Sequence, residues 1–220
     1  MVSSGPAVLF RSRFRRFAGA PDRSPARRRR APFPGPRALG LVLLGVSFLA
    51  GCTTLTPQQG SHLEEVRAFV ATAAQAYGIA PIPVRAEPQG GRRAATYHRG
   101  VISLSPDFLA PGPWRDVVLA HEVAHHLLSH DGPLPLEWDG HSQAQQRELD
   151  ADAKAVEVLQ RVRGLSEEEA FRLVYEAHWS LKRALEASPF SLPPGHPAPC
   201  VKLADLLRRF PAQQAWAKSC

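Results

Sequence analysis

Two histidines stand four residues apart in the segment His121-Glu-Val-Ala-His125, with a glutamate directly after the first. In a helix, residues four apart lie about 40° apart round the axis with Cβ atoms roughly 5–6 Å apart, so both imidazoles can bind one metal ion. Glu122 projects about 100° from His121, which places its carboxylate beside the pair. A zinc hydrolase needs this arrangement, because zinc acidifies a water towards a pKa of about 7 and the carboxylate accepts the proton.

A second pair of polar groups follows 23 residues after His125, where Glu148 and Asp152 are again four residues apart. On a helix these two carboxylates face the same way. A carboxylate from a second helix completes a His2Glu site and leaves the fourth position for water, as a catalytic zinc requires. The sequence therefore predicts one zinc ion per chain, bound by His121, His125 and Glu148. Asp152 is predicted to bond a histidine N–H as an outer partner that fixes its tautomer.

Three alternatives stay open for this segment. The histidines can belong to an ordinary solvated helix face. The third ligand can instead be the nearer His130 or Asp131. Asp131 would be the ligand of a metzincin-like site, but such a site needs a turn-forming Gly at the position of Leu128. A structural metal site is a further alternative, which Glu122 disfavours because structural sites are closed by four protein ligands and need no spare carboxylate.

The elements that must position these groups are mainly helices. The histidines fall in a predicted helix from Trp114 to His130, with packing positions at Trp114, Val117, Val118, Leu127 and Leu128. Caps and apolar periodicity predict four more helices. They are Ser61 to Tyr77 ended by Gly78, one from Ser142 with Gly164 after its end, one opened by Ser166 with Phe171, Val174, Leu181 and Leu185 buried, and Val201 to Phe210. His178 is interpreted as structural rather than as a ligand.

Two segments are predicted as strands, Pro81 to Pro88 and Ala94 to Leu104, the second broken by a turn at Arg99-Gly100. The second segment is either an ordinary edge strand or one that pairs with an extended substrate. The predicted fold class is therefore α+β: a mainly helical, zincin-type metallopeptidase domain over residues 61–220, with a small β-sheet carrying an edge strand beside the cleft.

Residues 1–51 have the features of an export signal. An Arg- and Pro-rich region precedes an apolar run from Leu39 to Ala50, which is too short for the ~20 residues of a membrane-spanning helix. The run ends in Leu-Ala-Gly-Cys52, which resembles the lipobox of bacterial lipoproteins. We therefore expect residues 1–51 to be cleaved, Cys52 to be lipidated, and residues 52–60 to tether the domain to a membrane. The expected location is the cell envelope, with the outer membrane facing the periplasm favoured because Thr53 is not the Asp that retains lipoproteins in the inner membrane.

The charge distribution argues against a nucleic-acid partner. The chain has 220 residues, 44% of them hydrophobic, and a formal net charge of +7. Ten arginines and a single acid, Asp22, lie in residues 1–51, so the remainder carries 17 Lys+Arg against 19 Asp+Glu. The folded part therefore lacks the basic excess that nucleic-acid binding requires.

The three cysteines fall into two groups. If lipidation uses Cys52, Cys200 and Cys220 remain as an even pair in an oxidising compartment, where they can form a disulfide. Two free thiols are the alternative.

The order of motifs resembles the HtpX-like and CAAX-prenyl-endopeptidase family of gluzincin metallopeptidases. The matching elements are His121-Glu-Val-Ala-His125 with His130, then Glu148-Leu-Asp-Ala-Asp152, then His196-Pro197 before a final helix. The resemblance implies that His121, His125 and Glu148 bind zinc and that Glu122 is the general base. It also makes His196 a candidate for stabilising the oxyanion or gating access.

The chain departs from this family in two ways. Lys202 stands where relatives often have an Arg, so a polar contact there is expected to be weakened or altered. No apolar span separates the HExxH and ExxxD motifs, unlike in the polytopic members. The expected function is a lipid-anchored zinc endopeptidase that acts on envelope or misfolded proteins. The alternative is a non-catalytic zinc-binding lipoprotein with a chaperone or assembly role.

Overall fold

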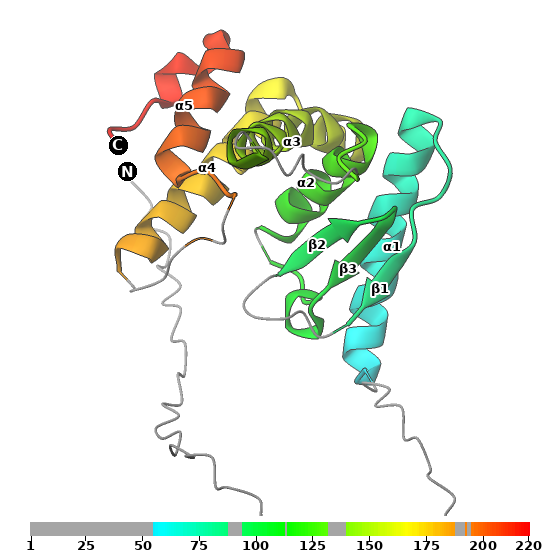
Figure 1. Cartoon of the computed structure of the whole chain (residues 1–220). Coiled ribbons are helices and arrows are strands. Elements are labelled where there is room, and N and C mark those ends of the chain that lie inside the picture. Colours follow the sequence, from blue (N-terminus) through cyan, green and yellow to red (C-terminus); the bar gives the residue numbers. More distant parts are fainter. Residues whose placement is uncertain (1–54, 88–93, 113, 132–139, 188–191, 193–194) are drawn as a thin grey trace, which may run out of the picture. The chain divides into compact units, whose positions relative to one another are not determined.

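A computed structural model of the chain describes residues 55–87, 94–112, 114–131, 140–187, 192 and 195–220 (Figure 1). In this part five α-helices and three strands follow the order α1 (Pro57–Tyr77), β1 (Val84–Ala86), β2 (Ala95–His98), β3 (Val101–Leu104), α2 (Arg115–Leu127), α3 (Gly140–Arg163), α4 (Glu167–Glu186) and α5 (Pro199–Arg209). Two short 3₁₀ helices, Pro106–Phe108 and Pro211–Trp216, follow β3 and α5. The fold is thus mainly helical with a small sheet, as the α+β prediction requires. The predicted signal peptide and Cys52 lie outside the described residues. Within those residues, no helix is long and apolar enough to cross a bilayer.

Helix α1 begins earlier than predicted. Thr56 caps it through a capping box with Gln59, and Pro57 occupies the first turn, where its missing N–H costs nothing. The predicted helix start at Ser61 is therefore wrong, because residues 57–60, assigned to the tether, already belong to the helix. The predicted end is confirmed, because Gly78 adopts a left-handed φ of 63°.

The sheet has the order β1-β3-β2, so β2 is an edge strand. β1 is parallel to β3, while β2 and β3 form an antiparallel hairpin in which His98 pairs with Val101. The predicted turn at Arg99-Gly100 is confirmed, and both residues have positive φ, 48° and 78°. Such primed turns match the twist of the flanking strands. The predicted first strand is shorter than expected and is confined to Val84–Ala86.

Helix α2 packs against α3, α1 and the edge strand β2. It therefore lies between the sheet and α3 (Figure 1). Val117, Leu119, Ala120 and Val123 of α2 are buried in the core. The predicted packing of Leu128 is wrong: the helix ends at Leu127, and Leu128 is 37% exposed.

Helix α4 starts at the predicted capping box of Ser166 and Glu169 and buries Phe171 and Val174. Leu181, predicted as buried, is instead 39% exposed, because the second half of α4 presents fewer residues to the core. Helix α5 packs against both α4 and α3. It begins at Pro199, two residues before the predicted start.

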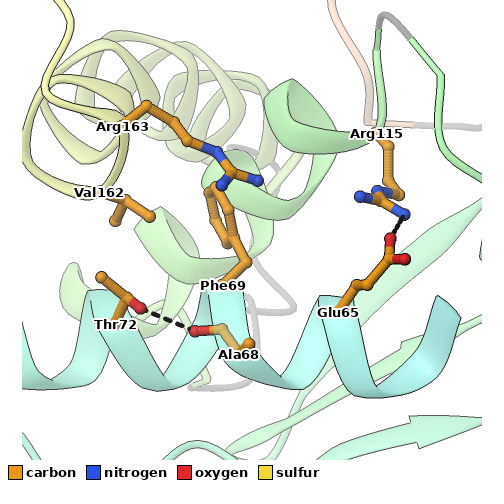
Figure 2. Close-up of a pocket in the computed structure, with 7 residues that line it drawn as sticks. All are labelled: Glu65, Ala68, Phe69, Thr72, Arg115, Val162 and Arg163. Atoms are coloured by element: carbon orange, nitrogen blue, oxygen red, sulfur yellow. Dashed lines mark hydrogen bonds and ion pairs between the residues drawn. The ribbon is translucent and has the colours of Figure 1, made fainter. Parts of the chain in front are cut away.

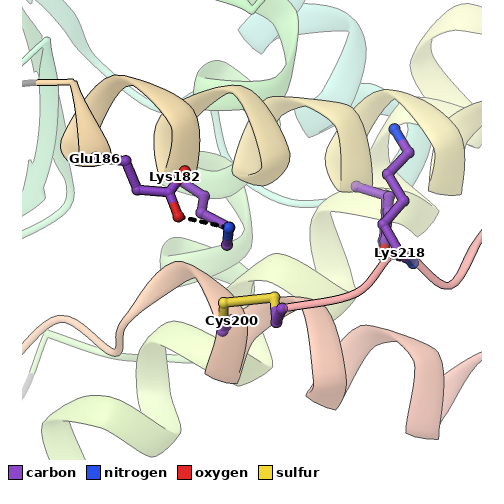
Figure 3. Close-up of a disulfide and its surroundings, with 6 residues drawn as sticks. Lys182, Glu186, Cys200 and Lys218 are labelled. Carbon is purple, nitrogen blue, oxygen red and sulfur yellow. Dashed lines mark hydrogen bonds and ion pairs between the residues drawn. A yellow bond between two sulfur atoms is a disulfide. The ribbon is translucent and has the colours of Figure 1, made fainter.

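A disulfide joins Cys200, at the start of α5, to the C-terminal Cys220, with Cα atoms 5.8 Å apart (Figure 3). This settles the alternative between a bridge and two free thiols. Lys218, two residues before Cys220, strengthens this attachment. Its backbone N–H donates to the Tyr175 hydroxyl, and its ammonium group donates to the Glu176 carboxylate, both on α4. The chain end is therefore held against α4 and the first turn of α5.

Candidate metal centre

The two histidines of α2 face one another as the helical spacing predicts. The Nε2 atoms of His121 and His125 lie 3.0 Å apart, and the rings meet edge to face. Both side chains are mostly buried, with 16% and 12% of their surface exposed. Val123 and Ala124, between them in sequence, are fully buried, which anchors this turn of α2 in the core.

Glu148 of α3 completes a group of three possible ligands. One carboxylate oxygen lies 3.4 Å from His121 Nε2 and the other lies 3.4 Å from His125 Nε2. The donor atoms of the three side chains all lie within 4.8 Å of one another, and this is the group that can hold a metal ion within the described residues. Separations of this size are close to those between donor atoms bound at about 2.0–2.2 Å to one ion. Two imidazoles and one carboxylate therefore fit a divalent metal.

Asp152, one turn further along α3, bonds the other side of the first histidine. Its Oδ1 lies 2.8 Å from His121 Nδ1, the contact that the spacing of Glu148 and Asp152 predicts. The same oxygen lies 3.1 Å from Nε2 of His178, a buried residue of α4. His178 therefore contacts the outer carboxylate, in agreement with its interpretation as structural.

The other ligand histidine has an outer partner that the sequence analysis did not assign. His130 Nδ1 lies 2.9 Å from His125 Nδ1. The sequence leaves His130 open as an alternative ligand, whereas in the structure it contacts His125 Nδ1, on the side of the ring away from the metal-ligand group. The sequence signal was the histidine five positions after His125, just past the end of the helix, where a turn can fold it back.

Asp131, the other alternative ligand, points to the sheet. Its carboxylate accepts hydrogen bonds from the Tyr97 hydroxyl and from the Gly100 backbone N–H, the latter at 3.2 Å. The Tyr97 hydroxyl also lies 3.0 Å from His126 Nδ1. Asp131 thus ties the hairpin to the end of α2 and is not part of the metal-ligand group. This geometry disfavours the metzincin-like alternative.

Glu122 directly follows His121 on α2 and is buried, with 7% of its surface exposed. It does not belong to the metal-ligand group, but the charges of His121 and Glu148 act on its carboxylate. The backbone N–H of Tyr97 donates a hydrogen bond to its carboxylate, which connects it to the edge strand β2. Burial raises the pKa of Glu122, and the negative charge of Glu148 raises it further. A carboxylate with a raised pKa beside a metal site is suited to accepting and returning a proton.

The segment before α5 brings His196 to the same carboxylate. His196 Nδ1 lies 2.9 Å from Glu148 Oε2, and 39% of the side chain is exposed. Gly195 permits this approach: its φ is 89°, and a Cβ atom there would lie 3.2 Å from the Cβ of Ala144 on α3. His196 is therefore at the solvent side of the candidate site.

Lys202 of α5 is buried between the two carboxylates of α3. Its ammonium nitrogen lies 2.9 Å from Asp152 Oδ2 and 3.4 Å from Glu148 Oε2. Burial alone would lower the pKa of Lys202, but the two negative charges raise it. Lys202 thus makes ion pairs with both acids of α3.

In the metal-free chain the pKa values of the histidines and carboxylates of this site are shifted far from their usual ranges. Burial lowers the pKa of His125 to about 4. Burial acts in the same direction on His121, but Asp152 and Glu148 outweigh it and raise the pKa of His121 to about 10. Burial opposes ionisation of Glu148 and Asp152, yet neighbouring histidines, and Lys202 beside Asp152, hold both pKa values below their usual range. In the metal-free chain these shifts favour a protonated His121 and a neutral His125 at neutral pH.

A cavity of about 320 Å³ lies elsewhere, between α1, the start of α2 and the end of α3 (Figure 2). Arg115 and Arg163 line it, but Arg115 pairs with Glu65 at 2.9 Å and Arg163 with Asp116 at 2.6 Å. Phe69 forms part of its wall. None of the metal-ligand group lines this cavity.

Comparison of the chain with protein-family models, with curated proteins and with solved structures finds no match.

Proposed function

We propose that the protein is a zinc-dependent endopeptidase. The observation that carries this proposal is the position of Glu122, buried beside the His121, His125 and Glu148 group and outside it. A site with three protein ligands leaves one position for water, and a free carboxylate next to that position is required for hydrolysis but has no use in a structural site. The donor set also favours zinc, because two imidazoles and one carboxylate are the ligands of many zinc hydrolases.

The residues divide the reaction between them. Zinc, when bound, would lower the pKa of a water and polarise the substrate carbonyl. Glu122 accepts the proton of the attacking water and passes a proton to the leaving amine. His196, at the solvent side, is placed to donate a hydrogen bond to the developing oxyanion.

The edge strand β2 is the proposed surface for substrate. It contacts α2, and its Tyr97 N–H donates to Glu122. An extended peptide paired with β2 would therefore lie close to Glu122, the proposed general base. Backbone pairing accepts many sequences, which suits proteolysis of misfolded or envelope proteins. The proposed fold is of the zincin type, and the proposed relatives are the HtpX-like and CAAX-prenyl endopeptidases that the motifs resemble.

The proposed location is the bacterial cell envelope, where the chain would be anchored through lipid on Cys52 and its substrates would be proteins or peptides. The disulfide between Cys200 and Cys220 supports an oxidising compartment outside the cytosol. No nucleic acid is a proposed partner.

The proposal is tested by comparing the full wild-type chain with Glu122→Gln for bound zinc and for cleavage of casein. Near-stoichiometric zinc in both is expected, with the cleavage rate lowered roughly 10²–10⁴-fold in the variant, because general-base catalysis contributes that much. Glu64→Gln is the matched control: it makes the same change at a carboxylate that is 68% exposed on α1, and it should retain full activity.

Two results would contradict the proposal. Absence of zinc from the wild-type chain would rule out the metal centre. Stoichiometric zinc with no cleavage of casein or unfolded proteins would favour the alternative, a zinc-binding envelope lipoprotein with a chaperone or assembly role.

A further inference from the structure

The two metal-ligand histidines are each bonded on the side away from the metal-ligand group. His121 Nδ1 lies 2.8 Å from Asp152, and His125 Nδ1 lies 2.9 Å from His130 Nδ1. A carboxylate at this position in a zinc site fixes the ring orientation and the tautomer of the ligand. The first contact follows that pattern, whereas the second replaces the carboxylate by an imidazole.

The geometry dictates which nitrogen carries the hydrogen when His125 binds a metal. A neutral imidazole has one N–H, so a ring whose Nε2 lone pair binds the metal carries its hydrogen on Nδ1. His125 Nδ1 must then donate, and His130 Nδ1, at 2.9 Å, must accept. His130 in turn keeps its hydrogen on Nε2. The pair therefore works in only one arrangement, in which His130 is the acceptor.

The backbone around His130 is shaped to bring the ring back to α2. After the helix ends at Leu127, Ser129 adopts a left-handed φ of 56°, which reverses the chain. The His130 N–H then donates to the His125 carbonyl at 3.0 Å, so backbone and side chain of His130 both contact the same residue. A left-handed conformation is unfavourable for a non-glycine residue and persists where surrounding contacts hold it.

Contacts on both sides hold this turn in place. Arg147 of α3, the neighbour of Glu148 in sequence, donates to the His130 carbonyl at 3.4 Å. Asp131, the next residue, binds the Tyr97 hydroxyl and the Gly100 N–H of the hairpin. The turn is thus connected to the helix that supplies the third ligand and to the edge strand.

We propose that His130 is a positioning residue of the metal centre, which accepts a hydrogen bond from His125 Nδ1–H and so aims His125 Nε2 at the metal. This role rests on the proposed zinc site. It requires no contact between His130 and the metal, and its acceptor is uncharged, unlike Asp152. Loss of such an outer partner lowers metal affinity by about 10–100-fold.

The test compares two replacements in the full chain. His130→Asn retains an acceptor, because its side-chain oxygen can stand near the place of Nδ1, whereas His130→Phe keeps a ring without an acceptor. His62→Gln on α1 is the matched control, a histidine remote from the site whose closest charged partner is Glu65 at 3.6 Å. Zinc dissociation constants are measured by competition with a chelator, the absorption spectrum of the Co²⁺-substituted protein reports the ligand geometry, and thermal unfolding of the metal-free chain reports the fold.

We expect His130→Phe to bind zinc about 10–100-fold more weakly than wild type and to change the Co²⁺ spectrum. His130→Asn should recover most of the affinity, and His62→Gln should match wild type. The inference is overturned if His130→Phe binds zinc as tightly as wild type. It is also overturned if the Asn and Phe variants lose equal affinity in step with a lowered unfolding temperature, since that pattern reports a structural role.

Failure of this inference is distinguishable from failure of the proposed function. A wild-type chain that binds no zinc overturns the metal centre, and the role of His130 with it. A wild-type chain that binds zinc and depends on Glu122 for cleavage, together with an unaffected His130→Phe variant, overturns the role of His130 alone.

Discussion

Lys202 on α5 places its ammonium group 2.9 Å from the carboxylate of Asp152 on α3, at a position where 7% of the lysine side chain is exposed. The same group lies 3.4 Å from Glu148, so the buried ammonium offsets negative charge on both acids of α3. Replacing Lys202 by Met removes this compensation, and breaking a buried pair costs about 3–5 kcal/mol. We expect the free energy of unfolding of the metal-free Lys202→Met variant, measured by denaturant titration, to be lower than that of wild type by this amount.

Zinc should rescue this variant, because a divalent cation beside Glu148 replaces part of the missing positive charge. The stabilisation by saturating zinc is therefore expected to be larger in Lys202→Met than in wild type, as measured by urea unfolding with and without the ion. Lys202→Arg is the control that keeps the charge. Equal stabilisation of Lys202→Met and wild type by zinc would contradict this account of the lysine.

Zinc affinity should rise with pH. The pKa of His121 in the metal-free chain is raised to about 10, so this ring is protonated at pH 6–8 and must lose its proton to bind a metal. The pKa of His125 is lowered to about 4, so that ring is already neutral and adds no dependence in this range. We expect affinity to increase about tenfold per pH unit between pH 6 and 8, with release of one proton per ion in calorimetry. A flat profile would show that His121 is neutral before zinc binds.

Replacing Glu148 by Ala should lower the zinc content of the protein, whereas replacing Asp131 by Ala should not. Glu148→Ala removes a carboxylate that lies 3.4 Å from both ligand histidines and should leave the chain with substoichiometric zinc. Asp131→Ala should retain zinc and lose about 1–2 kcal/mol of stability, because its bonds to Tyr97 and Gly100 hold the hairpin. Zinc content and unfolding free energy together separate the two outcomes. The reverse pattern would move the third ligand to Asp131.

The disulfide should contribute substantially to stability. Cys200 and Cys220 are separated by 20 residues, and closing a loop of that length stabilises the folded chain by about 3 kcal/mol in the chain-entropy model. For a chain of this size, replacing both cysteines by serine should lower the unfolding temperature by about 6–12 °C. Calorimetric scans with and without a reductant measure the effect. A reductant should lower the transition of the wild-type chain and leave that of the double variant unchanged.

Local signals predicted much of the secondary structure. The capping box at Ser166, the left-handed glycine at Gly78 and the Arg99-Gly100 turn are interactions among residues close in sequence, so the sequence shows them directly. The start of α1 was missed because two capping boxes compete, and Thr56 with Pro57 is the earlier of the two. Leu181 was misassigned because helical periodicity identifies an apolar face but not whether another element covers it.

The sequence by itself predicted that His121 and His125 of α2 lie side by side as candidate metal ligands, since residues four apart on one helix are neighbours on its surface. It also indicated Glu148 and Asp152, whose common face follows from the same spacing. Only the tertiary structure decided between Glu148, His130 and Asp131 as partners of the histidines, because that choice depends on how α3, the turn after α2 and the hairpin pack together. The structure sets Glu148 against both rings, His130 behind His125 and Asp131 on the hairpin. Contacts between residues far apart in sequence depend on packing, which no local pattern records.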